Sequence, residues 1–441
     1  MNTLLFFESF ILRNNPFGYE HVVSKVLNSL RNYHNVPQVW GKVNPLLVLS
    51  KYAAINHKNV VMLPESVSKE LMRLGTEWNQ EAIGQWMNLM RGTGKISELF
   101  YDILYYLYKK HPFENIIYWG SNDTVKKFAD SVGACSMAME LGPTRSPFFA
   151  SNYCDFAGVN GDSHSKHLIL EKFSEYDPEA FLAGEGIVSP SGRRLDQIFT
   201  PIESEKSKFL YNSDKPLALL VLQLDDDSNC LIHSDFNGMK EVVSMAVPEL
   251  VKAGWQVLVK PHPAAALSQC QGKDRILNYL AHEECRTFIK QNFNETQALW
   301  VDDIGVDGYM SLLFKSDAVI SVNSSVCFEA ILLGKVACVL GEAPYNVDKS
   351  LPAFDQICSG SFDKKQYDKI NRQIANVMLN YYLYSGDLLS APWELNFAVQ
   401  RNRLLSKVFK RGDKELLTEY VLKNPIKLID HCLGGEGQLC L

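Results

Sequence analysis

The sequence predicts an α/β protein with two Rossmann-like halves and a helical C-terminal tail. Short apolar runs rich in β-branched residues alternate with segments of helical spacing, which is typical of parallel, doubly wound sheets. The alternation stops between residues 142 and 213, a stretch with many Gly, Pro, Ser and Asn residues, and resumes at Pro216. A length of 441 residues also favours two domains over one.

The first half is expected to begin with a strand and to continue in regular alternation. Met1–Leu12 contains Glu8, and no basic region precedes its apolar run, so a strand is expected there and not a signal peptide. Further strands are expected at Val60–Leu63, Ile116–Trp119 and Cys135–Met139, and helices at Glu20–Tyr33, Ile96–Lys109 and Asp123–Val132. Within the interruption we expect a helix at His167–Phe173 and a linker at Pro190–Ser207.

The second half repeats the pattern and ends in a tail. Strands are expected at Leu217–Leu224, Gln256–Lys260, Ala298–Val301, Ala318–Val322 and Val336–Leu340, and helices at Gly238–Lys252, Arg275–Lys290, Tyr309–Phe314 and Ser325–Leu333. From about Lys364 the chain is mostly amphipathic helix, with a break at Pro392. The expected domains are therefore residues 1–205, residues 206–385 and a helical tail of residues 386–441 that packs back on the body.

Composition excludes several classes of protein. Hydrophobic residues make up 46% and charged residues 21%, as in globular proteins, and the net charge of −6 gives no reason to expect nucleic acid as a partner. The ten cysteines are scattered without a C-x-x-C pair, which favours a reducing compartment over a disulfide framework or a zinc site. No run of eighteen apolar residues occurs, so the expected location is the cytoplasm.

A βαβ unit at Asp317–Gly341 carries the first candidate site. Asn323, Ser324 and Ser325 follow its first strand and begin its helix, where free backbone N–H groups and two hydroxyls can hold a phosphate. Glu329 lies one turn after Ser325 on the same helix face and is a candidate for the sugar hydroxyls of a nucleotide. The alternative is an ordinary capped helix with a solvated glutamate.

An acidic cluster follows the strand that ends near Leu224. It consists of Gln223, then Asp225, Asp226 and Asp227, then Ser228. Adjacent carboxylates repel one another, which raises some of their pKa values. A role for one acid as catalytic base or nucleophile would explain why the sequence keeps such a cluster. A solvated acidic turn and a metal-binding D-x-D motif remain alternatives.

Two further clusters follow strands. Lys260 and His262 stand on a turn that is stiffened by two prolines, where they can neutralise a phosphate leaving group. Lys110-His111-Pro112 has a similar composition but follows a helix, so it is treated as a decoy. Glu140 ends another strand, and Arg145 after it can clamp a carboxylate, unless the two are a surface pair.

Together these clusters resemble the motifs of GT-B glycosyltransferases that use CMP-activated acidic sugars, and most closely bacterial β-Kdo transferases of capsule and O-antigen synthesis. The similarity runs from about Met139 to Tyr345. It lies in the segments Glu140–Ser146, Asp155–Gly158, Gln223–Ser228, Val259–Pro263 and Ser324–Ala330.

The resemblance implies transfer of Kdo from CMP-β-Kdo with net retention, through an aspartate nucleophile and without a metal or other cofactor. It implies catalytic roles for Asp226 or Asp227, Glu140 and His262. Arg145, Gln223 and Ser228 would bind Kdo, whereas Lys260, His262, Asn323, Ser324, Ser325 and Glu329 would bind CMP. The acceptor would be a saccharide or lipid-linked saccharide, and peripheral association with the inner membrane or an assembly complex is compatible with this.

The sequence departs from the family pattern in two places. The capsule enzymes show Q-x-x-x-D-x-S; here Gln223 plus four gives Asp227, whereas the position of Ser228 favours Asp226. Glu342–Tyr345 replaces the Gly-Trp-Gly-rich loop that follows the last motif.

Other functions stay open on the sequence alone. One is another CMP- or nucleotide-sugar transferase, including a sialyltransferase-like enzyme. A second is a metal-dependent transferase or pyrophosphorylase with Asp225 and Asp227 as ligands, and a third is a non-catalytic nucleotide-binding subunit of a polysaccharide assembly complex.

Overall fold

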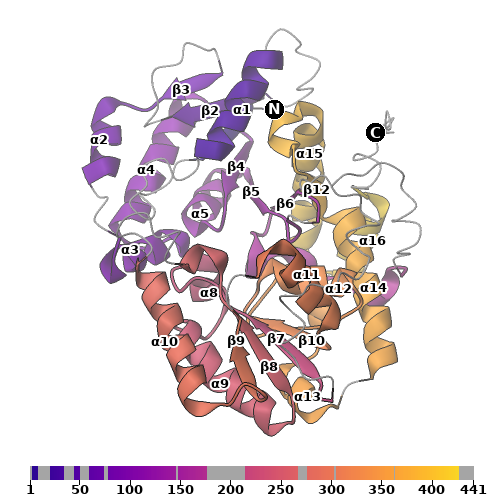
Figure 1. Ribbon diagram of the computed structural model, residues 1–441. Coiled ribbons are helices and arrows are strands. Elements are labelled where there is room, and N and C mark those ends of the chain that lie inside the picture. Colours follow the sequence, from indigo (N-terminus) through magenta and orange to yellow (C-terminus); the bar gives the residue numbers. More distant parts are fainter. Residues whose placement is uncertain are drawn as a thin grey trace. The chain divides into compact units, whose positions relative to one another are not determined.

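The computed structural model describes residues 2–7, 20–33, 44–49, 59–73, 78–145, 148–175, 214–266, 276–301, 304–361 and 363–426. The expected linker at Pro190–Ser207 lies outside these residues. The chain forms two compact units (Figure 1). The first comprises residues 1–140, 152–164 and 386–420, and the second comprises residues 141–151, 165–385 and 421–441.

The first sheet orders its strands β12-β6-β5-β4-β1-β2-β3. The pairs β1–β2, β2–β3, β1–β4 and β4–β5 are parallel, as the alternating pattern predicted. The strands are β1 (Asn2–Phe6), β2 (Asn44–Leu49), β3 (Val60–Met62), β4 (Asn115–Trp119), β5 (Cys135–Leu141), β6 (Ser151–Asp155) and β12 (Leu383–Ser385). The helices before β6 are α1 (Glu20–Tyr33), α2 (Glu65–Arg73), α3 (Gln80–Met90), α4 (Gly94–Lys110) and α5 (Asp123–Val132).

The second sheet orders its strands β11-β10-β7-β8-β9, and all four pairings are parallel. The strands are β7 (Leu217–Val221), β8 (Gln256–Lys260), β9 (Ala298–Trp300), β10 (Ala318–Ser321) and β11 (Val336–Val339). The helices are α8 (Ser228–His233), α9 (Met239–Lys252), α10 (Ile276–Asn292), α11 (Gly305–Lys315), α12 (Ser325–Leu332), α13 (Phe354–Ser359) and α14 (Lys364–Tyr381). Strand order reverses between β7 and β10, so their carboxyl ends form the topological switch point of the sheet.

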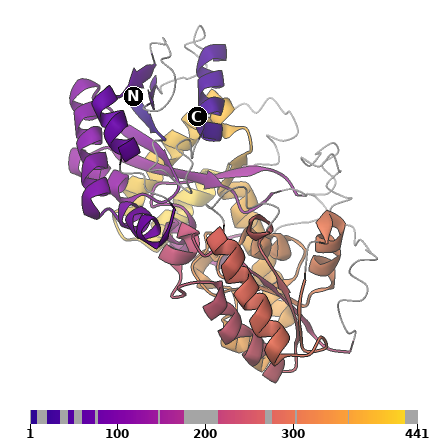
Figure 2. The ribbon, with the colours of Figure 1, turned by 60° about the vertical axis from the view of Figure 1, so that its left-hand side comes forward.

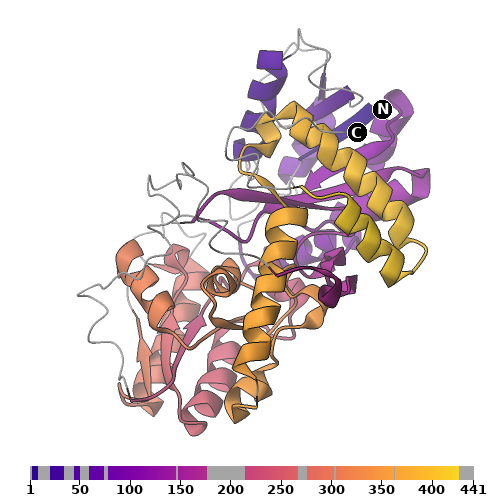
Figure 3. The same ribbon diagram turned by 90° about the vertical axis from the view of Figure 1, so that its right-hand side faces the viewer.

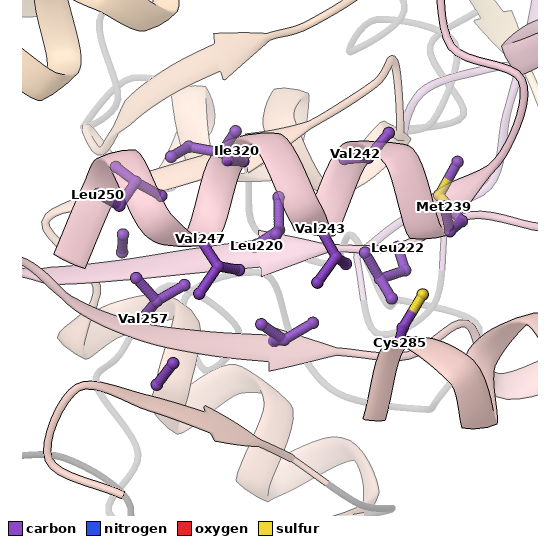
Figure 4. Packing of buried hydrophobic residues seen from close by; sticks show 14 of the residues in the cluster. Leu220, Leu222, Met239, Val242, Val243, Val247, Leu250, Val257, Cys285 and Ile320 are labelled. Carbon is purple, nitrogen blue, oxygen red and sulfur yellow. The ribbon is translucent and has the colours of Figure 1, made fainter. Parts of the chain in front are cut away.

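The core of the second unit explains why its strands read as continuous apolar runs. Helices α9 and α10 lie side by side on one face of this sheet (Figure 2). Val243 and Val247 of α9 pack in one cluster with Leu220 of β7 and Val257 of β8, all fully buried (Figure 4). Because both faces of a parallel sheet are covered, every residue of β7 is buried.

The C-terminal helices confirm the predicted helical tail. Helix α14 packs against α12 within the second unit (Figure 3). Pro392 occupies the first position of α15 (Pro392–Phe409), where its missing N–H is not needed by the helix. Arg403 of α15 pairs with Glu114 at 2.9 Å, and Lys410 pairs with Asp130 at 3.3 Å, within the first unit. Helix α16 (Lys414–Lys423) follows.

The predicted helix at His167–Phe173 is wrong. Two short 3-10 turns, His164–His167 and Leu170–Lys172, stand there instead. Tertiary hydrogen bonds take the backbone groups that a helix would use, because Leu170 N–H donates to Asp348 and Gln373 donates to the carbonyls of Leu170 and Phe173. None of the helices that the structure describes is long and apolar enough to span a bilayer.

Candidate active site at the switch point of the second sheet

A reciprocal amide pair joins the two strand ends at the switch point. Gln223 Nε2 donates to Asn323 Oδ1, and Asn323 N–H donates to Gln223 Oε1, both at 2.9 Å. Asn323 Nδ2 also donates to the carbonyls of Asn229 and Glu342, at 2.9 and 3.2 Å. These hydrogen bonds connect the loops after β7 and β10 and hold them in register.

Replacing Gln223 with alanine is expected to lower the free energy of unfolding by about 1–3 kcal/mol, because Asn323 loses two partners. Asn323→Ala should cost a similar amount, and the double variant less than the sum, since either change breaks the same pair. Urea denaturation of the four proteins measures this coupling. If the losses of unfolding free energy were strictly additive, Gln223 and Asn323 would not be energetically coupled.

Two of the three adjacent acids hold helix N-termini. Asp225 Oδ1 accepts the N–H of Met239 at 2.9 Å, at the start of α9. Gly238 makes room for this contact, because a Cβ there would lie 2.7 Å from Asp225 Oδ2. Burial raises the pKa of Asp225, although the Met239 N–H opposes the shift. Asp227 Oδ1 accepts the N–H of Asn229 at 2.9 Å and caps α8, whose first residue is Ser228.

Exposure separates the two acids that the sequence left as alternatives. Asp226 is 2% exposed, whereas Asp227 is half-buried. The Asp227 carboxylate also faces the N-terminus of α8, which stabilises its negative charge. A nucleophile must be both ionised and accessible, so this geometry favours Asp227.

Helix α10 supports the acidic loop from behind, which the sequence analysis did not foresee. The fully buried Asn278 accepts the N–H of Asp225 at 2.8 Å, and His282 Nε2 lies 2.9 Å from the Gln223 carbonyl. Because that carbonyl can only accept, Nε2 carries the proton, and burial lowers the pKa of His282 and keeps the ring neutral. Asn278, His282, Cys285 and Ile289 form one buried stripe on α10.

Lys260 and His262 lie at the end of β8, next to β7 in the sheet. His262 Nδ1 accepts the N–H of Ala264 at 3.1 Å and caps a 3-10 turn. In the neutral ring the proton therefore sits on Nε2, which can donate to an anion. This hydrogen bond fixes the orientation of the imidazole ring.

The start of α12 is also held by side chains. Ser324 is its N-cap and accepts the N–H of Val326 at 3.4 Å, and Ser325 is its first residue. Tyr345 donates to the Ser324 carbonyl at 2.5 Å. The segment Glu342–Tyr345, which replaces the glycine-rich loop of the family, thus packs against the candidate phosphate cradle.

Glu329 lies behind this cradle in a cluster of charged and aromatic groups. It is 3% exposed, and its Oε2 accepts the Tyr309 hydroxyl at 2.5 Å. Burial raises the pKa of Glu329 to about 7, although Tyr309, Arg145 and Lys260 lower it in part. This burial favours a supporting role for Glu329 over the direct ribose contact that the sequence suggested.

Arg145 and Glu140, which the sequence grouped together, belong to different compact units. Arg145 belongs to the second unit, and its N–H and guanidinium charge act on Glu329. Glu140 lies on β5 and is the last residue of the first of the three segments that make up the first unit. Among the residues that the structure describes, no three His, Cys, Asp or Glu side chains are grouped to hold a metal ion.

Two protein-family models match the chain. The capsule polysaccharide biosynthesis protein family matches residues 162–384, just over half of the sequence. The N-terminal domain of the glycosyltransferase 99 family matches residues 49–164. No protein of curated function matches the sequence.

Several solved structures share a general likeness. The β-Kdo 2,7 transferase of KpsC from Thermosulfurimonas dismutans aligns with 89% of this chain and 99% of its own, at 12% identity and a TM-score of 0.41. The β-Kdo 2,4 transferase of the same protein aligns with 64% and 88%, at 14% identity and a TM-score of 0.38. UDP-GlcNAc 2-epimerase from Neisseria meningitidis aligns with 85% and 97%, at 11% identity and a TM-score of 0.33.

Proposed function

Because the chain belongs to the capsule polysaccharide biosynthesis protein family, we propose that it transfers Kdo from CMP-β-Kdo to a saccharide acceptor with net retention of configuration. The two family matches identify a glycosyltransferase. The observation that carries the proposal is the convergence of acids, a basic turn and a capped helix start on one sheet edge. CMP-Kdo as donor rests on the motif resemblance.

We propose Asp227 as the nucleophile of a two-step reaction. Its carboxylate oxygen attacks the anomeric carbon of Kdo as the bond from that carbon to the CMP phosphate breaks, and CMP leaves. The acceptor hydroxyl then attacks the same carbon, the bond to Asp227 breaks, and the hydroxyl proton passes to a base. Glu140 is the proposed base.

The leaving phosphate is proposed to bind groups at the ends of β10 and β8, the two strands that flank β7. The hydroxyl of Ser325, the first residue of α12, supplies a neutral donor, and Lys260 supplies charge. His262 contributes Nε2–H because its Nδ1 is already committed to Ala264. These groups stabilise charge that develops on the phosphate as the sugar departs, so no metal is required.

Alanine substitution of His262 or Ser325 is expected to weaken CMP binding by about 1–3 kcal/mol, the loss of a hydrogen bond to a charged group. Isothermal titration with CMP measures this. His111→Ala and Ser244→Ala are matched controls, since His111 ends α4 and Ser244 bonds within α9. Unchanged CMP affinity in both site variants would remove the assignment.

The reaction itself is tested with CMP-Kdo as donor. Release of CMP that is not inhibited by EDTA is expected, together with a product that keeps the donor's anomeric configuration. CMP binding without CMP release would instead identify a nucleotide-binding subunit. Complete loss of activity in EDTA would favour the metal-dependent alternative.

A further inference from the structure

Tyr309 connects the two charged groups that lie on either side of it in the second unit. Its hydroxyl donates to Glu329 Oε2 at 2.5 Å, and the Lys260 Nζ stands 5.2 Å from the centre of its ring. The three side chains come from α11, α12 and the end of β8. One residue therefore contacts both the carboxyl group behind the cradle and the lysine proposed to meet the phosphate.

Glu329 is the titrating member of this cluster. Its pKa of about 7 arises from burial, opposed by the Tyr309 hydroxyl, by Arg145 and by Lys260. Burial raises the pKa of Tyr309 well above its ordinary value, so the phenol stays a hydrogen-bond donor throughout the neutral range. Cys327 and Tyr345 also act on these groups, but burial raises their pKa values, to about 12 for Cys327, so they stay neutral.

We propose that Tyr309 is a positioning residue that couples the protonation of Glu329 to the placement of Lys260, so that the site holds an anionic nucleotide phosphate more tightly when Glu329 is neutral. This deepens the proposed function and rests on it. No role for Tyr309 follows from the motifs, because it lies outside all of them.

The coupling follows from charge. When Glu329 is ionised it attracts the positive charges of Lys260 and Arg145 and repels an incoming phosphate. When it is protonated, both cations are available to the ligand. A group whose protonated form binds better loses affinity as pH rises through its pKa, here about 7. Loss of the Tyr309 hydroxyl removes a donor to the carboxylate and moves that pKa upward.

The experiment is a titration of CMP into the wild type, Tyr309→Phe and Glu329→Gln between about pH 6 and about pH 8.5, the range that brackets the expected titration. Because the CMP phosphate itself titrates near pH 6, each affinity is divided by that of Glu329→Gln at the same pH. The wild-type ratio should fall by about tenfold across the range. In Tyr309→Phe, which keeps the ring under Lys260, the fall should occur at higher pH.

A second measurement needs no variant. Titration of wild-type protein with CMP near neutral pH in buffers of different ionisation enthalpy should reveal proton uptake on binding, beyond that of CMP alone. A wild-type ratio that stays constant with pH, or a Tyr309→Phe midpoint equal to that of the wild type, would overturn the inference while leaving the proposed function in place. A wild type that binds no CMP at any pH would overturn the proposed function itself.

Discussion

Asp227→Asn is expected to reduce Kdo transfer by several orders of magnitude while leaving the fold and CMP affinity nearly unchanged. The amide keeps an oxygen that can accept the Asn229 N–H and cap α8, as the carboxylate does at 2.9 Å. It is a far poorer nucleophile, so the interaction lost belongs to the transition state and not to the ground state. Transfer from CMP-Kdo and CMP titration, measured on the same preparation, separate the two effects.

The neighbouring acids provide matched controls. Asp226→Asn changes a buried carboxyl one residue away, and Asp225→Asn changes the group that binds the Met239 N–H, so both should act mainly on stability. Mass spectrometry after brief exposure to CMP-Kdo should show a Kdo adduct in the wild type. The adduct should persist in Glu140→Gln, where the second step is slow, and vanish in Asp227→Asn.

Two results would refute this assignment. An adduct that survives in Asp227→Asn and disappears in Asp226→Asn would make Asp226 the nucleophile. Protein without adduct in every variant, together with inverted product stereochemistry, would leave a carboxylate that acts only as a base, and a single displacement would replace the two-step reaction.

Much of the fold could be predicted from local pattern. Runs such as Leu217–Val221 and Ala318–Ser321 are apolar because both faces of a parallel strand are buried. The strand β2 and the helix α8 were not expected, and α8 has only six residues, too few to show a helical period. The His167–Phe173 segment was mispredicted because contacts with Asp348 and Gln373, about two hundred positions away, decide its backbone.

The candidate site was predictable where it follows strands. The place of Gln223, Lys260 and Asn323 at one sheet edge could be predicted, because parallel strands deliver their carboxyl ends to the same edge. Tyr309 could not be found, since its partners come from two other elements. The different roles of the three adjacent aspartates could not be predicted either. Their capping contacts depend on where α8 and α9 begin, and the sequence does not show this. The buried stripe of α10 could have been predicted, because Asn278, His282 and Cys285 have the i, i+4, i+7 spacing of one helix face.

Asp155→Asn is expected to have the largest effect on stability, about 3–5 kcal/mol, because it removes a fully buried carboxylate from the donors that surround it. Asp155 and His164 are both fully buried, and Asp155 Oδ2 lies 2.8 Å from His164 Nδ1. The same oxygen accepts the His164 N–H and the hydroxyls of Tyr153 and Ser163, while Oδ1 accepts the Ala157 N–H. A neutral amide cannot replace the charge, and it turns one acceptor into a donor that faces donors.

We therefore expect the segment Asp155–Gly158, which resembles a family motif, to support the integrity of the first unit. Asp130→Asn is the matched control, since it breaks an exposed pair with Lys410 in the same unit and should cost less than about 1 kcal/mol. Limited proteolysis at increasing denaturant concentration shows which of the two units unfolds first, because the folded unit remains as a protease-resistant fragment. If Asp155→Asn were as stable as Asp130→Asn but lost transfer, the segment would belong to the active site.

Acid gives an independent check of the same prediction. Burial alone would raise the pKa of Asp155, but the charge of His164 and the surrounding donors together hold it below the ordinary value. The carboxylate therefore contributes its full stability above the unfolded value of about 3.9, and that contribution is lost as pH falls through the lower folded value. The wild type should keep its advantage over Asp155→Asn from neutral pH down to about pH 4 and lose it only in stronger acid. An advantage that disappears between about pH 7 and about pH 5 would contradict a lowered pKa of Asp155.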